Sequence, residues 1–401
     1  MSRSAEYTIR GFVYQFNKSL LAILQSGKDE EITLEGIVED VEVRSPGGLT
    51  AIQCKYHGSV HSFVPSKIYE PLLQMMRHFH QNRGASVRYI LFGHFRGMED
   101  APQRSELKRY VQSALRSQSL ALKVLISEFS ERFDVDGFLR KFSMELGPDL
   151  DTLTSQVYGA LRESGIPGED IDTLAYPNAV NMVATLSTKA DVLERTITKA
   201  SLLAHLMAVR RTAISRWTMA LGTRKKLLDA RRRQLKPHLS INSRLRCFLI
   251  NFDQLGAQVD QFVSFVRDYL NRYHFKPAHN LTPIFCLSSK EAVLPEIAHL
   301  LFEKGVKAAD GYVAGHFEQS DLFREPLCAR KNSEFRREFQ LRLVRWQDHG
   351  SLLGSQKCDD LFVIGDLDLN SLKTSGWEIE QISTSSLAEL KFILGVSDVI
   401  D

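Results

Sequence analysis

The sequence lacks the marks of several large protein classes. No apolar run approaches the ~20 residues that a membrane-spanning helix needs, and no apolar segment of the signal-peptide kind follows the amino terminus. The chain also has no G-x-x-x-x-G-K-S/T loop, no H-E-x-x-H motif and no G-x-S-x-G motif. These absences predict a cytoplasmic protein without a membrane segment. They argue against ATP hydrolysis by this chain alone, and against zinc-protease and hydrolase-triad chemistry.

Cysteine is scarce as well. The five cysteines in 401 residues lie far apart, and none belongs to a C-x-x-C pair or stands beside a histidine at zinc-finger spacing. We therefore expect buried small side chains or plain thiols, with no disulfide and no structural zinc site.

Net charge is low at +3, but the positive charge is concentrated in one stretch. Residues 210–246 contain twelve Lys or Arg against a single acid, Asp229. A concentrated basic stretch favours a polyanionic partner more strongly than a high total charge does.

The composition, 43% apolar and 25% charged over 401 residues, is typical of a soluble globular protein with two or three domains. The alternation of helical and strand patterns predicts an α/β protein. We expect a mixed α/β domain over 1–110, a helical region over 111–238, and an α/β domain for assembly or regulation over 239–401.

In the first region the predicted order is helix, strand, turn, strand, helix, strand. The corresponding ranges are 7–25, 32–43, 45–48, 49–56, 66–82 and 86–95. Farther along, 189–234 predicts one long helix or two helices broken at Gly222, ended by Pro237. In the last region we expect strands at 284–287, 340–346, 361–364 and 378–382, and helices at 252–273, 291–303 and 386–394.

The residues most informative about chemistry lie on either side of the turn at 45–48. Asp40 is expected near the end of the first strand, and Gln53 and Lys55 lie on the second. Because side chains alternate along a strand, Gln53 and Lys55 point to the same face. If the two strands pair as a hairpin, Asp40 falls opposite them, and a carboxylate, an amide carbonyl and an ammonium converge.

This set of groups suits a divalent cation. A carboxylate and neutral oxygens are ligands that Mg²⁺ accepts, with water and phosphate oxygens in its other positions. Asp40 and Gln53 are therefore the candidate ligands for Mg²⁺, or for Mn²⁺ in its place. Such an ion polarises a phosphate and generates hydroxide from bound water, while Lys55 orients that water or offsets developing charge.

The pattern resembles the PD-(D/E)XK nuclease superfamily, in the variant where Gln-x-Lys replaces Glu-x-Lys. It is similar to a narrower group, the double-stranded DNA endonuclease domain of effectors in bacterial CBASS and Lamassu anti-phage systems. The likeness rests on Gly11-Phe-Val-Tyr-Gln15, Glu35 with Glu39-Asp40, Gln53-Cys-Lys-Tyr-His57 and Phe92-Gly-His-Phe95. It implies a restriction-endonuclease-like domain, catalytic roles for Asp40, Gln53, Lys55 and Glu35, and a supporting role for Gln15.

A less specific interpretation stands beside this one. Lys55 also fits a surface ion pair with an acid on the facing strand, worth under ~1 kcal/mol. Glu39 and Glu42, which flank Asp40, are expected to be solvated rather than catalytic. The acids at Asp359-Asp360 and in Gly365-Asp-Leu-Asp368 are likewise expected to be solvated strand ends rather than a second metal site.

Two basic clusters predict a DNA-binding helix. They are Arg224, Lys225 and Lys226, and Arg231, Arg232 and Arg233. The clusters begin seven residues apart, about two helical turns, so they recur on similar faces. Such a helix suits phosphate contacts that do not read sequence. The alternative is a solvated face or a contact with an acidic partner subunit.

The predicted function is metal-dependent cleavage of double-stranded DNA with little sequence preference, as an effector of bacterial anti-phage defence. Because the sequence shows no nucleotide switch, we expect control by partner subunits and by homo-oligomerisation. The resemblance favours a Lamassu-type system, which implies an SMC-like ATPase and a small accessory subunit as partners. CBASS nucleases instead carry a C-terminal sensor of cyclic oligonucleotides. Two alternatives stay open: an inactive DNA-binding scaffold, and a methylation-dependent restriction enzyme.

Overall fold

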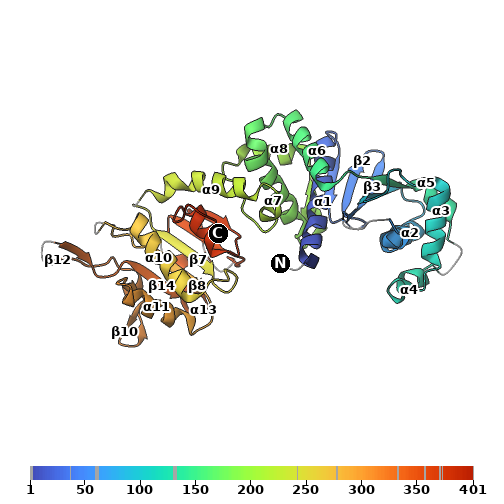
Figure 1. Cartoon of the computed structure of the whole chain (residues 1–401). Coiled ribbons are helices and arrows are strands. Elements are labelled where there is room, and N and C mark those ends of the chain that lie inside the picture. Colours follow the sequence, from blue (N-terminus) through green and yellow to red (C-terminus); the bar gives the residue numbers. More distant parts are fainter. Residues whose placement is uncertain are drawn as a thin grey trace. The chain divides into compact units, whose positions relative to one another are not determined.

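The computed structural model describes residues 3–36, 38–58, 63–129, 133–241, 243–276, 279–331, 334–355, 358–369, 372 and 374–400. The chain divides into two compact units, Met1–Arg210 and Arg211–Asp401. Both units are built from helices and strands, which confirms the α/β class (Figure 1). The helices between residues 110 and 210 belong to the first unit. The basic helix, at 224–239, belongs to the second.

The first unit has a six-stranded mixed sheet in the order β5-β4-β3-β2-β1-β6. Strands β1 to β3 form an antiparallel meander, whereas β4 and β5 continue the sheet in parallel with β3. The strands are β1 (Glu31–Leu34), β2 (Val41–Ser45), β3 (Gly48–His57), β4 (Val87–Phe95), β5 (Phe142–Leu146) and β6 (Thr196–Ile197).

Helices cover both faces of this sheet (Figure 1). On one face α1 (Arg3–Gln25) packs against β3, α6 (Leu150–Glu163) and α7 (Tyr176–Ser187). On the other, α2 (Tyr69–Gln81) buries Leu73 and Met76 in a core with Tyr89 of β4. Each fully buried side chain of this kind contributes about 1.5–3 kcal/mol. The remaining helices are α3 (Arg104–Leu115), α4 (Leu120–Ser127), α5 (Val135–Lys141) and α8 (Lys199–Ala208).

Two predicted elements of this unit are corrected. The single strand expected over 32–43 is interrupted, because Glu35 adopts a φ of 47° and turns the chain between β1 and β2. Asp40 therefore precedes the second strand instead of ending the first. The long helix expected from residue 189 is also wrong, since Thr196 pairs with Thr33 at the sheet edge before α8 begins.

The second unit has a six-stranded parallel sheet in the order β16-β15-β7-β8-β14-β9. Its central strands β15 and β8 are buried along all or nearly all of their length, as expected for a parallel sheet covered on both faces. The strands are β7 (Arg246–Asn251), β8 (Ile284–Ser288), β9 (Ala308–Ala309), β14 (Leu341–Arg345), β15 (Asp360–Ile364) and β16 (Glu378–Ile382). Two short hairpins lie outside it: β10 (Tyr312–Val313) with β11 (His316–Phe317), and β12 (Cys328–Lys331) with β13 (Glu334–Arg337).

The helices of the second unit are α9 (Arg224–Leu239), α10 (Val259–Tyr273), α11 (Val293–Glu303), α12 (Gln319–Phe323), α13 (Trp346–His349) and α14 (Leu387–Ile393). The predicted strands β8, β14, β15 and β16 are confirmed within a residue or two, whereas β7 was not predicted. Pro237 does not end α9, which continues to Leu239, a buried residue.

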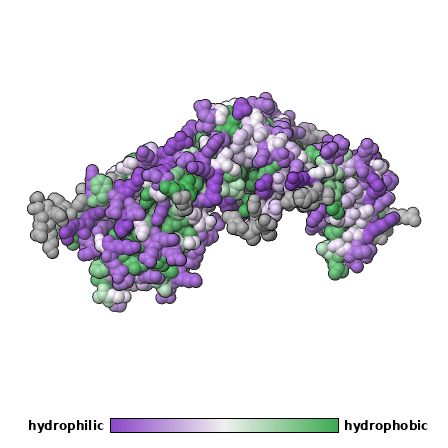
Figure 2. All heavy atoms as spheres, in the orientation of Figure 1, coloured by the Kyte–Doolittle hydropathy of each residue, from purple (hydrophilic) through white to green (hydrophobic). Residues whose placement is uncertain are grey.

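Two further findings concern membrane-spanning helices and the cysteines. No described helix is long and apolar enough to cross a membrane. All five cysteines are free, and four of them are buried, which confirms the prediction of plain thiols. Figure 2 shows hydrophilic side chains over much of the visible face, with apolar side chains exposed at α4, where Leu120 and Val124 are 81% and 69% exposed.

Candidate active site

The loop between β1 and β2 sets the position of Asp40. Two backbone hydrogen bonds close it: Glu35 N donates to Asp40 O at 2.8 Å, and Gly36 N donates to Glu39 O at 2.9 Å. A Cβ on Gly36 would lie 2.2 Å from Cδ of Glu42, so a larger residue there would have to displace the Glu42 side chain. The loop therefore returns the chain tightly and brings Asp40 to the first position before β2.

The two glutamates that flank Asp40 are buried. Glu42 and Glu39 are 5% and 6% exposed, so the expectation that they are solvated is wrong. Glu39 belongs to the loop, and Glu42 belongs to β2. Glu42 Oε1 accepts a hydrogen bond from Val38 N at 2.5 Å and so holds the loop. Oε1 of Glu39 has no hydrogen-bond partner among the described residues.

Asp40 lies opposite β3, as the predicted hairpin requires. Val41 pairs with Ile52, so Asp40 comes next to Gln53. Oδ2 of Asp40 accepts hydrogen bonds from Nε2 of Gln53 and from the backbone N of Cys54, the latter at 2.8 Å. In this arrangement the amide carbonyl of Gln53 is left over for another partner.

Lys55 lies two residues beyond Gln53 and points to the same face of β3. Its side chain is half-buried. Within the part of the chain that the structure describes, its ammonium forms no ion pair, so the ion-pair alternative does not account for it.

The buried acids and the ammonium act on one another. Burial raises the pKa of Asp40 to about 6, against the hydrogen bond from Cys54 N and the charge of Lys55. Burial also raises the pKa of Glu39 to about 9; the charge of Asp40 adds to this rise and that of Lys55 opposes it. Glu39 is thus a member of the site that sequence reasoning missed, because a run of acids gives no signal of burial.

Gln15 and Glu35 complete the set of predicted residues. Nε2 of Gln15 on α1 donates to Oε1 of Glu35 at 2.5 Å. The carbonyl oxygen of Glu35 accepts a hydrogen bond from Nη1 of Arg195, also at 2.5 Å. These contacts fix the loop on two sides. The structure therefore brings together all five residues predicted for the nuclease site, which are Gln15, Glu35, Asp40, Gln53 and Lys55.

A stack of aromatic rings joins α1 to the strands beside this site. The ring centroids of Tyr14 and Tyr56 lie 4.8 Å apart, and those of Tyr56 and His94 lie 5.5 Å apart. Tyr14 also donates a hydrogen bond to the carbonyl of Pro148 at 3.2 Å. Tyr14 precedes Gln15 on α1, so the contacts of Tyr14 fix the part of α1 that carries Gln15.

The donors present suit only a metal ion that keeps several waters. Within the described residues, no three His, Cys, Asp or Glu side chains gather to hold an ion. Asp40, the carbonyl of Gln53 and the unpartnered Oε1 of Glu39 are oxygen donors in one small region. Mg²⁺ binds to one or two carboxylates with water and phosphate oxygens in its other positions, so these residues fit it.

The structure divides the six predicted DNA-binding residues of α9 into two sets. Three pair with acids of the second unit itself: Arg224 with Glu389, Arg231 with Glu380, and Arg232 with Asp398. Arg231 is only 3% exposed, so it is not accessible to a DNA phosphate. The other three, Lys225, Lys226 and Arg233, are exposed.

The acids of the parallel sheet have two different environments. Asp360 is 3% exposed and accepts hydrogen bonds from Arg244 at 2.6–3.0 Å, so it is a buried structural acid rather than the solvated one expected. Asp366 follows β15, and its backbone N donates to Oε1 of Gln254 at 2.7 Å.

Strands β7 and β15 are neighbours, and the chain leaves them toward opposite edges of the sheet: from β7 to β8, and from β15 to β16. In parallel sheets, ligands bind outside the carboxyl ends of strands at such a reversal. Asn251 ends β7, Gln254 follows β7, and Asp366 follows β15 at this point.

Comparisons with known proteins give distant likenesses only. No family model matches the chain, and no curated protein matches it. A solved Cap4 SAVED/CARF-domain receptor from Acinetobacter baumannii, with the cyclic trinucleotide 2'3'3'-cAAA, has 12% identity and a TM-score of 0.31, covering 94% of this chain and 82% of that one. A Moraxella osloensis Cap4 SAVED/CARF-domain receptor has 11% identity and a TM-score of 0.30, covering 99% and 94%. Likenesses this weak do not say what the chain does.

Proposed function

We propose that this chain is a metal-dependent nuclease that cuts DNA at a site formed by Asp40, Gln53 and Lys55. One observation carries the proposal: the buried carboxylate of Asp40, directly before β2, bonds to the amide of Gln53 on β3, and Lys55, two residues farther on the same face, forms no ion pair with any described residue. The order α1, antiparallel β1 to β3, α2 and then β4 supports a restriction-endonuclease-like domain, because it follows the predicted order of the region that carries the resemblance, with the first strand divided into β1 and β2.

In this proposal each residue has a separate task. Asp40 and Gln53 hold Mg²⁺ or Mn²⁺, which when bound supplies Lewis-acid activation of the phosphate and of water. Lys55 donates hydrogen bonds to the attacking water or to a phosphate oxygen and offsets the charge that develops there. Gln15 and Glu35 hold the loop that carries Asp40 and act as positioning residues.

The proposed substrate is double-stranded DNA, cut with little sequence preference. Lys225, Lys226 and Arg233 are exposed cations that suit phosphate contacts, and such contacts do not read bases. We also propose that the chain is an effector of bacterial anti-phage defence, as the sequence resemblance implies. An uncontrolled nuclease would degrade its own genome, so its activity must be controlled. Its control would come from homo-oligomerisation and from an SMC-like ATPase and a small accessory subunit, as in Lamassu-type systems.

Plasmid cleavage tests the proposal. Purified protein at several concentrations is incubated with supercoiled plasmid and Mg²⁺, beside Asp40→Ala and beside wild type in EDTA. The expected result is nicking or linearisation by wild type alone, rising more steeply than protein concentration if self-assembly activates it. Equal cleavage by wild type and Asp40→Ala would contradict it, and methylation-dependent cleavage would favour a restriction enzyme.

A second candidate function rests on the parallel sheet. The reversal between β7 and β15 is a geometry that suits a nucleotide ligand. In this alternative the chain is a CBASS-type effector whose second unit binds a cyclic oligonucleotide. Solved Cap4 receptors from Acinetobacter baumannii contain ligands of this class, 2'3'3'-cAAA and 3'3'3'-cAAA. Thermal unfolding with 3'3'3'-cAAA and 2'3'3'-cAAA distinguishes the two. A rise in Tm with ligand concentration supports the sensor, and an unchanged Tm supports control by partner subunits.

A further inference from the structure

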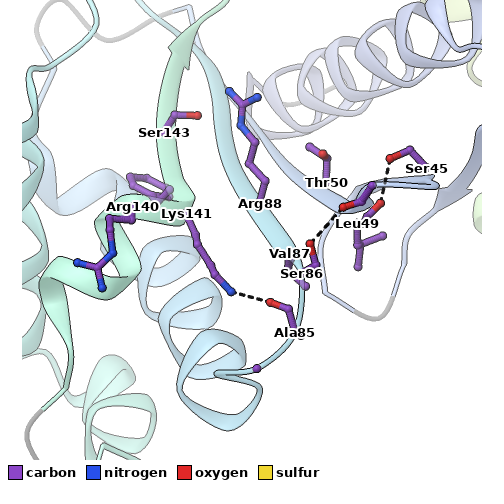
Figure 3. A pocket seen from close by; sticks show the side chains of 14 residues that line it. Ser45, Leu49, Thr50, Ala85, Ser86, Val87, Arg88, Arg140, Lys141 and Ser143 are labelled. Carbon is purple, nitrogen blue, oxygen red and sulfur yellow. Dashed lines mark hydrogen bonds between the residues drawn. The ribbon is translucent and has the colours of Figure 1, made fainter.

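A groove of about 830 Å³ lies at the ends of several strands of the first unit's sheet, on the side away from the candidate active site (Figure 3). Its walls are the amino-terminal ends of β3, β4 and β5 and the turn before β3. Gly48 begins β3, and Lys55 lies seven residues farther along it. Thr50, the lining residue of β3 nearest to Lys55, lies five residues before it, which is about 17 Å along the strand at ~3.3 Å per residue.

The lining of the groove is positive. It includes Arg88, Arg140 and Lys141 and no acidic residue. Arg88 is weakly paired with Glu145 at 3.7 Å, and its side chain stays 63% exposed. Arg140 at the rim forms no ion pair with any other described residue. Lys141 donates from Nζ to the carbonyl of Ala85 at 2.6 Å and so closes the floor of the groove.

Hydroxyl groups lie next to these cations. Oγ of Ser143 is buried and has no hydrogen-bond partner among the described residues. Thr50 pairs with Arg88, and Ser143 pairs with Ile90, two residues beyond Arg88, so the three side chains share one face of the sheet. Figure 3 shows Arg88 and Ser143 on neighbouring strands of this face. An unsatisfied buried hydroxyl is destabilising, and a hydrogen bond to an acceptor oxygen would offset that cost.

We propose that this groove binds a phosphate group beside Arg88, which supplies charge, with Ser143 as a hydroxyl donor; Arg140, whose side chain points away from Arg88 in Figure 3, adds positive charge to the groove at a second place. Guanidinium groups pair with two phosphate oxygens at once, and the absence of acids from the lining leaves no competing anion in it. The volume lies within the range of ligand sites and exceeds what a single ion needs. The phosphate comes from a nucleic-acid backbone or from a free nucleotide. The site is independent of cleavage at Asp40.

Binding assays in EDTA test this site without depending on nuclease activity. The full chain is titrated with a fluorescein-labelled 20-base-pair duplex by anisotropy, and with deoxyadenosine monophosphate by calorimetry. The test variant is Arg88→Glu/Arg140→Glu. The control, Arg109→Glu/Lys123→Glu, makes the same change in net charge at exposed positions of α3 and α4.

We expect the test variant to lose at least tenfold in affinity for one probe while the control stays within about twofold of wild type. Loss for the duplex alone, with a salt slope reduced by about two, identifies a nucleic-acid backbone. Loss for the nucleotide identifies a free nucleotide. Equal affinities of test variant and control, or no binding of either probe by wild type, would overturn the proposal. Thermal unfolding of each variant, with Arg88→Ala/Arg140→Ala as a milder pair, separates lost binding from lost folding.

Discussion

Glu39 is a carboxyl group in a place where ionisation is unfavourable. Burial, together with the charge of Asp40, raises its pKa from 4.5 to about 9. A folded pKa above the unfolded value means that folding favours the protonated form. The stability contributed by this group is therefore fully present below about pH 4.5 and is lost as the pH rises towards 9.

This shift predicts that Glu39→Gln flattens the dependence of stability on pH. In EDTA, the wild-type free energy of unfolding should fall between pH 5 and pH 9, and the variant should lose less over the same range. Urea unfolding at three pH values measures it. Glu163→Gln, at an exposed position of α6, is the control. Parallel pH profiles for wild type and Glu39→Gln would contradict the account.

At the residue scale, the sequence predicted that Asp40 lies opposite the Gln53 to Lys55 region, but it placed Asp40 at the end of the first strand and not directly before β2. Strand alternation and a glycine turn constrain which side chains face one another, and the observed register of β2 and β3 agrees with that constraint. The burial of Glu39 was not predictable in this way. It depends on the left-handed Glu35 and on the close approach of Gly36 to Glu42, which are properties of the folded loop.

At the scale of elements, part of the positive charge of α9 pairs with acids of the second unit and is not available to a partner. Arg231 is buried and pairs with Glu380, which is itself 4% exposed. Its buried position lowers the pKa of Arg231 to about 10, so the side chain stays charged at neutral pH. The run of cations was read as one charged face, but packing of α9 against α14 turns part of that run inward.

We expect Arg231→Ala to destabilise the second unit by about 3 kcal/mol, because breaking a buried ion pair leaves an uncompensated charge. Arg211 also contacts Glu380 and keeps the loss near the lower end of the usual range. Chemical denaturation measures the change. Arg233→Ala, at an exposed position of the same helix, should stay within about 0.5 kcal/mol of wild type. Equal stability of the two variants would show that the pair is not structural.

Element prediction failed where tertiary contacts decide. Strand β7 begins directly after the basic stretch, at Arg246, and that charge masked an apolar run that the sheet buries. Strand β6 has two residues, too few for any periodic signal, and exists because it pairs with β1. Strands β3, β4 and β15 were predictable because their apolar runs are bounded by turns.

At the scale of the whole molecule, the two compact units predict independent folding. All the proposed catalytic residues lie within residues 1–210, and the parallel sheet lies within 211–401. Each segment expressed alone should therefore show a cooperative thermal transition, as domains with their own cores do. Calorimetry of the two segments measures it. A segment without a transition would show that its core depends on the other.

The central claim is that Lys55 acts in DNA cleavage, and the most direct measurement is the cleavage rate of Lys55→Ala set beside its affinity for DNA. Wild type, Lys55→Ala and the exposed control Lys28→Ala are compared with Mg²⁺ for cleavage and with EDTA for binding. The account predicts a loss of about a hundredfold or more in rate for Lys55→Ala, with unchanged affinity and a normal control. Cleavage by Lys55→Ala at the wild-type rate would contradict the account, and no cleavage by any variant, even with partner subunits added, would favour an inactive DNA-binding scaffold.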